Sequence, residues 1–157
     1  MTRARTLKLA AALLAGLAAL PALAAPASVP KELTFRIGGG LQGVVTLSFK
    51  DGKLTCEQTR GAPEMPVAQT SPEAWQQFRA ALDEVNVWRW RSAYANPYVL
   101  DGTVWNLHVR YADKVVGSSG ANEYPNANGG PNGSSEYSES FNQLRAALMK
   151  LAVGCLL

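Results

Sequence analysis

The two cysteines are the residues whose number and placement most directly predict a chemical bond. The chain of 157 residues contains Cys56 and Cys155 and no other thiol. In an oxidising compartment such a pair usually forms a disulfide, and a bridge that closes a loop of about 100 residues stabilises by up to about 4.7 kcal/mol in the chain-entropy model. The alternative is two separate buried thiols. We expect the disulfide, and the lack of a C-x-x-C motif argues against a redox function.

His108 is the single histidine of the sequence, and a hydrolase would pair it with Asp101 and with Ser118 or Ser119. No G-x-S-x-G nucleophile motif supports that arrangement. We therefore interpret His108 as a surface residue and keep a small hydrolase-like enzyme as the alternative function. One histidine, no paired cysteine ligands and dispersed acids predict neither a zinc site nor another cofactor.

An aromatic cluster is the strongest candidate for a binding surface. Its members lie within eleven residues and alternate with arginines: Trp88, Trp90, Tyr94 and Tyr98, with Arg89 and Arg91. Because Trp, Tyr and Arg dominate interface hot spots, an exposed cluster would anchor an envelope protein or stack on a glycan. The alternative is that these rings cap the core between a helix and the sheet. The long polar loop at 120–135 adds Asn122 and Tyr124 to the candidate partner or ligand surface.

The elements that position these residues follow from hydrophobic periodicity and turn signals. Alternation of apolar and polar residues predicts strands over 33–37, 45–50, 53–59, 104–111 and 115–119. Asp51-Gly52 predicts a two-residue hairpin, in which Lys50 faces Lys53 and Leu47 faces Cys56. Directly opposed residues share a face of the sheet, so Cys56 is expected in the core.

Two amphipathic helices complete the predicted fold. Ser71-Pro72-Glu73 is a helix start, and apolar residues at helical spacing continue to about 86; the second helix covers about 136–152. The element order β-β-β-α-β-β-α and the short turns predict an α+β domain. We expect an antiparallel sheet of about five strands with both helices packed on one face, and a polar opposite face that carries Asn106 and His108.

The first residues have the three parts of a secretory signal. Basic residues precede an apolar run over 9–20, and Ala22-Leu23-Ala24 is a small-x-small cleavage site. The run is shorter than the roughly 20 residues of a spanning helix, which argues against the alternative, a membrane anchor. We expect residues 1–24 to be a signal peptide, residues 25–157 to form one domain, and the protein to be periplasmic or secreted.

Charge then argues against a nucleic-acid partner. The full chain has 15 basic and 12 acidic residues, and the signal holds three of the basic ones. The mature chain is therefore formally neutral, without the clustered basic patch that nucleic acid requires.

A motif in the second half resembles small exported bacterial proteins of unknown function. It consists of Asp101-Gly102-Thr103-x-Trp105-x-Leu107, then Gly120-x-Asn122-x-Tyr124-Pro125, then an amphipathic helix, and the resemblance covers about 70–152. It implies a structural signature and transfers no functional residue. We expect Asn122 to tie the strand end to the final helix. The function expected from the sequence is a non-enzymatic binding or interaction module.

Overall fold

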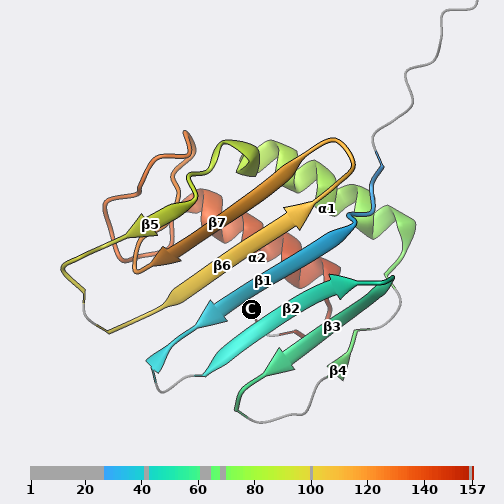
Figure 1. Cartoon of the computed structure of the whole chain (residues 1–157), viewed down its shortest axis with the longest axis horizontal. Helices are drawn as coiled ribbons and strands as arrows, with labels where there is room; N and C mark the ends of the chain where they lie inside the picture. The colour runs from blue at the N-terminus through green and yellow to red at the C-terminus, as the bar shows by residue number, and fades with distance from the viewer. Residues whose placement is uncertain (1–26, 41–42, 61–64, 68–69, 100, 156) are drawn as a thin grey trace, which may run out of the picture.

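The computed structural model describes residues 27–40, 43–60, 65–67, 70–99, 101–155 and 157. The expected signal peptide lies outside the described residues. The described part forms one seven-stranded sheet, two α-helices and a short 3-10 helix (Figure 1). Their bounds are β1 Glu32–Gly38, β2 Val44–Lys50, β3 Lys53–Gln58, β4 Met65–Pro66, α1 Pro72–Val85, η2 Val87–Arg89, β5 Ala93–Ala95, β6 Val104–Arg110, β7 Val115–Ala121 and α2 Glu139–Leu151.

The sheet has the strand order β4-β3-β2-β1-β6-β7-β5. All five predicted strands are present, and each is antiparallel to its neighbours among them. Two short edge strands were not predicted. One of them, β5, runs parallel to β7, so the sheet is mixed rather than antiparallel. The sequence around β5 is aromatic-rich and lacks a clear period, because its three residues are too short to display alternation.

The β2–β3 hairpin has the predicted register. Asp51 and Gly52 form the turn with φ angles of 51° and 77°, as the tight two-residue loop requires. Lys50 pairs with Lys53 and Leu47 with Cys56. The turn therefore places the Cys56 side chain on the core face, where it is buried.

Capping side chains set where both helices begin. The Ser71 hydroxyl accepts a hydrogen bond from the Ala74 amide at the start of α1, as the sequence predicts. The start of α2 differs from the prediction by three residues, because the Ser138 hydroxyl accepts from the Phe141 amide and makes Glu139 the first helical residue. A serine at this position satisfies a backbone N–H that the helix leaves unpaired.

Both helices cover one face of the sheet, which gives two layers with the core between them (Figure 1). The apolar positions of strands and helices meet in one cluster, as predicted, and its centre is formed by Phe35, Leu47, Leu82, Leu107, Phe141 and Leu148. The opposite face carries polar rows across the strands. In one row Ser48, Thr34 and His108 lie side by side on β2, β1 and β6.

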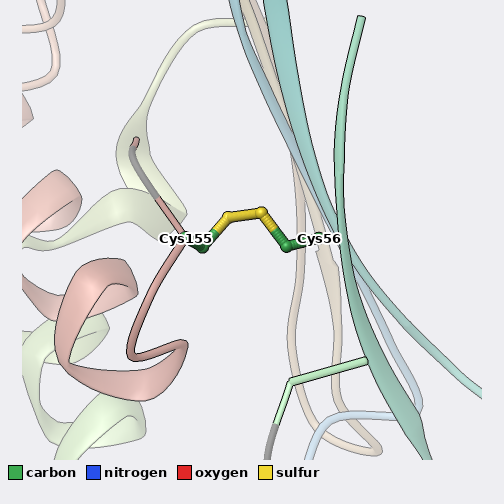
Figure 2. Close-up of a disulfide and its surroundings, with 2 residues drawn as sticks. All are labelled: Cys56 and Cys155. Atoms are coloured by element: carbon green, nitrogen blue, oxygen red, sulfur yellow. A yellow bond between two sulfur atoms is a disulfide. The ribbon is translucent and has the colours of Figure 1, made fainter. Parts of the chain in front are cut away.

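The predicted disulfide joins Cys56 of β3 to Cys155, four residues after α2 (Figure 2). The two Cα atoms are 5.9 Å apart, within the usual range for a bridge. Both cysteines are buried. The bridge holds the segment that follows α2 against the sheet, so it also positions Leu157, which lies at the edge of the core.

Candidate functional site

Most of the predicted aromatic surface lies inside the molecule. Trp90, Tyr94 and Tyr124 are buried and pack around Trp105 at ring-centre distances of 5.8 to 6.4 Å. The Tyr94 hydroxyl donates to the Gly129 carbonyl oxygen, which fastens the polar loop to β5. Burial raises the pKa of Tyr94. Trp90 and Tyr94 therefore belong to the core, as the alternative interpretation of the aromatic cluster has it. Tyr124, which was expected on the candidate surface, is buried beside them, so the prediction of an exposed surface is wrong for all three.

Trp88 and Tyr98 are at least partly exposed, as the predicted binding surface requires. Tyr98 is 92% exposed at the tip of a turn after β5. Trp88 is half-buried, and its indole nitrogen donates to Asp83. Its ring also packs edge-on against Tyr111. The two side chains thus have separate surroundings, and only Tyr98 is free to contact a partner.

Asn122 is a buried connector rather than a surface residue. Its side-chain oxygen accepts a hydrogen bond from the Thr103 amide, and its side-chain nitrogen donates to the Val99 carbonyl oxygen. It therefore ties the end of β7 to the loop before β6, which corrects the expected connection to α2. The link toward α2 comes instead from the Ser138 hydroxyl, which donates to the Pro125 carbonyl oxygen.

The residues proposed for a hydrolase are not assembled. His108 is half-exposed on the open face, and its Nε2 lies 3.5 Å from a carboxylate oxygen of Glu32. Ser118 is buried on the core side and donates to the Arg91 carbonyl oxygen. Ser119 donates to a backbone oxygen as well. Within the described residues, no hydrogen bond or ion pair joins His108 to Asp101 or to either serine.

A cleft of about 850 Å³ opens where the glycine-rich end of the sheet meets α2. Ile37, Val45 and Leu157 line it with apolar side chains, and Tyr137, Arg145 and Met149 line it from α2 and the segment before α2. The loop that carries Asp101 and Thr103 completes the wall on the sheet side. Four segments that are distant in the sequence therefore form one concavity.

In the sheet-side wall, the backbone at two glycines lies too close to neighbouring residues for a side chain to fit. A side-chain carbon at Gly39 would lie 2.2 Å from the Gly102 oxygen, and one at Gly102 would lie 2.0 Å from Asn122. Glycine is required at both positions because no larger residue fits. The D-G-T and G-x-N parts of the motif thus lock the β1–β2 turn against the loop before β6, which fixes Thr103 at the rim of the cleft.

Arg145 is the cationic group of the cleft. Its Nη2 donates to a main-chain oxygen of Leu157, the last residue of the sequence, at 2.7 Å, and its guanidinium lies 4.4 Å from the centre of the Tyr137 ring. Its Nε is buried without a hydrogen-bond partner in the described part of the chain. These contacts orient the guanidinium at the wall of the cleft.

Arg79 on α1 is a buried guanidinium that two carboxylates pair with. It is 6% exposed, donates to both oxygens of Asp113 and pairs with Asp83. Its hydrogen bonds lower the pKa of Asp113. At Asp83 burial would raise the pKa, but hydrogen bonds from Lys114, Trp88 and Arg79 lower it overall. This cluster joins α1 to the β6–β7 turn and has a structural role.

The sequence contains a signal for both arginines. Arg145 lies four residues after Phe141 and three before Leu148, inside the apolar stripe of α2. Arg79 has the same position in α1 between Trp75 and Leu82. A charged residue within an apolar stripe faces the protein interior or its edge and needs a partner there. We did not predict a role for either arginine from the sequence.

No protein-family model and no curated protein sequence matches this chain. The resemblance to small exported bacterial proteins therefore stays a prediction. In the part of the chain that the structure describes, no helix is long and apolar enough to cross a membrane. The described residues also contain no group of three or more His, Cys, Asp or Glu side chains placed to hold a metal ion.

Proposed function

We propose that this protein is an extracytoplasmic binding domain whose ligand occupies the cleft between the glycine-rich end of the sheet and α2. The observation that carries the proposal is the cleft itself. Its volume of about 850 Å³ falls in the range typical of small-molecule sites, roughly 300–1,000 Å³. Such sites combine an apolar lining with a few convergent polar groups, and Arg145, Asp101 and Thr103 supply those groups here.

The extracytoplasmic location is supported by two independent features. The first 24 residues have the pattern of a cleaved export signal, and the disulfide is buried and links distant parts of the fold. Disulfides of this kind persist in oxidising compartments. The protein acts in the periplasm or in the medium under this proposal.

Binding is favoured over the hydrolase alternative by where the polar side chains point. The core side of β7 carries Ser118, whereas His108 lies on the open face of β6 and contacts Glu32. A nucleophile and its base must lie within hydrogen-bond reach of each other. The cleft, in contrast, needs no rearrangement of the fold to accept a ligand.

A fluorescent probe tests the proposal without knowledge of the natural ligand. We expect the uncharged probe N-phenylnaphthylamine to bind the protein saturably, with about one site per chain. Met149 lines the cleft and is 41% exposed, so Met149→Glu should weaken binding several-fold without disturbing the fold. Val153 is 81% exposed and does not line the cleft, which makes Val153→Glu the matched control.

Two results would contradict the proposal. One is the absence of saturable probe binding to the folded, disulfide-bonded protein. The other is an equal effect of Met149→Glu and Val153→Glu, because a probe that binds elsewhere does not distinguish the two positions.

A further inference from the structure

We propose that the disulfide completes the binding cleft, so that the protein binds its ligand only after Cys56 and Cys155 have been oxidised to the bridge. This inference rests on the proposed function and adds to it the regulation of that same site. The observation that carries it is the path of the chain after α2, which runs from the helix to the bridge and then to Leu157 at the cleft.

The segment 152–157 contributes directly to the cleft. Leu157 lines the cleft and is 7% exposed. A main-chain oxygen of the same residue accepts the hydrogen bond from Nη2 of Arg145, which also lines the cleft. Leu157 thus supplies apolar wall and orients the side chain beside it. The shape of the cleft therefore depends on Leu157 being held in place.

The bridge is attached to the sheet next to the floor of the cleft, which is formed by Ile37 and Val45. These two residues pair across β1 and β2. Cys56 on β3 pairs with Leu47, which lies two residues after Val45 on the same face of β2. Figure 2 shows the bridge running from β3 to the segment after α2. The covalent bond therefore fixes this segment beside the residues that form the floor.

Few other interactions hold the segment against the sheet. Its main-chain hydrogen bonds are local: the Ala152 amide donates to the Leu148 carbonyl oxygen, and the Cys155 amide donates to the Ala152 carbonyl oxygen. Between the described residues of the segment and the strands there is no main-chain hydrogen bond. Ordering residues 153–157 costs more conformational free energy than burial of the Leu157 and Cys155 side chains supplies. Without the bridge, the position of Leu157 is not maintained.

Formation of the bridge is a two-electron oxidation. The two thiols lose two protons and two electrons to a disulfide-bonded oxidant, which is reduced to two thiols as the new S–S bond forms. Both cysteines are buried in the folded protein, so a reductant has little access to the completed bridge. The oxidation is therefore a one-way step, in which a reduced chain in the cytoplasm lacks the complete cleft and the exported, oxidised chain has it.

A pair of insertions tests whether the bridge positions Leu157, without removing the bridge. Insertion of Gly-Ser-Gly directly after Cys155 separates Leu157 from the bridge. The same insertion directly after Val153 lengthens the chain before the bridge and leaves the link from Cys155 to Leu157 unchanged. Val153 is 81% exposed, and a side-chain carbon at Gly154 would meet nothing within 4 Å, so the control insertion fits.

The two insertions should differ in their affinity for N-phenylnaphthylamine. We expect the insertion after Cys155 to weaken binding of the probe about fivefold or more, because the apolar contact with Leu157 is lost. The insertion after Val153 should stay within about twofold of the oxidised wild type.

The double variant Cys56→Ala/Cys155→Ala tests the requirement for oxidation itself. Trimethylamine N-oxide in the assay favours the folded state, and near-ultraviolet circular dichroism of the aromatic rings around Trp105 verifies the fold. Leu33→Ala is the matched control for lost stability, because it leaves a cavity in the core, keeps the bridge and lies at the opposite end of β1 from the cleft. We expect the folded double variant to bind the probe about fivefold or more weakly, and Leu33→Ala to bind it within about twofold of the wild type.

The outcomes separate this inference from the proposed function. Equal probe affinity of the oxidised wild type and the folded double variant would overturn the inference, and so would equal affinities of the two insertion variants. The insertion pair does not depend on the folding of the double variant. In each of these cases saturable binding to the oxidised wild type leaves the binding function standing. If the oxidised wild type does not bind the probe saturably, the proposed function itself is wrong.

Discussion

Removal of the disulfide should cost this protein a large part of its stability. The bridge joins residues separated by 99 positions, Cys56 and Cys155. In the chain-entropy model, a closed loop of about 100 residues corresponds to about 4.7 kcal/mol at room temperature, and measured losses from small secreted domains are about 2–5 kcal/mol. Because a whole domain of ordinary stability has only about 5–15 kcal/mol, the double variant Cys56→Ala/Cys155→Ala should be marginally folded.

Equilibrium urea denaturation of the oxidised wild type and the double variant measures this loss. The variant replaces both cysteines with small apolar side chains, so that no free thiol is left to exchange or to be oxidised. We expect the free energy of unfolding to fall by about 3–5 kcal/mol. A loss below about 1 kcal/mol would refute the reasoning, since it would mean that the bridge does not restrict the unfolded chain.

Three further predictions concern the core, an ion-pair cluster and export. Leu107→Ala should lower the free energy of unfolding by about 2–5 kcal/mol because the Leu107 side chain is fully buried. Asn106→Ala, on the open face, should change it by less than about 0.5 kcal/mol. Equal losses in urea denaturation would contradict the two-layer arrangement. Arg79 lowers the pKa of Asp113 in the folded protein. The ion pair therefore stabilises the fold fully at pH values above the ordinary Asp pKa of about 3.9. This stabilisation is lost as the pH falls through the lower pKa that Asp113 has in the folded state. Stability measured from about pH 5 down to pH 2 should therefore fall less steeply in Arg79→Met than in the wild type, and parallel curves would show that the pair contributes nothing. Intact-mass analysis of protein from the periplasm or medium should give a chain that begins at Ala25, and a full-length cytoplasmic species would show that residues 1–24 are not a signal peptide.

The features set by local rules were predictable from the sequence. Asp51-Gly52 determines the hairpin turn, and the period of two then places Leu47 and Cys56 on the same face. The alternation from Trp105 to Tyr111 likewise predicts which side of β6 is buried. In each case the information is contained in a few adjacent residues, so no knowledge of the tertiary fold is needed.

The burial of the aromatic segment could not be predicted from local rules of this kind. Trp90 and Tyr94 are buried because β5 joins the sheet edge beside β7 and the polar loop closes over them. A parallel pairing between residues that are more than twenty positions apart leaves no local signal. The segment is therefore compatible with both an exposed cluster and a core cap until the fold is known.

The cleft could not be predicted for a related reason. Its wall depends on the approach of Gly39 to Gly102, and its cation depends on Arg145, which lies on the last helix. The sequence does mark Arg145 by its place in the apolar stripe. It does not reveal that Arg145 lies at the wall of a cleft, whereas Arg79 pairs with Asp113.

The most direct test of the binding proposal is a map of where the neutral probe contacts the protein. Amide proton–nitrogen correlation spectra recorded during titration with N-phenylnaphthylamine report on each backbone position. We predict that the largest shifts occur around the cleft, at Gly39, Thr103 and Met149, and that Ser48 and His108 on the open face do not shift. Shifts centred on the open face, or on the groove between the two helices, would contradict the assignment of the cleft as the binding site.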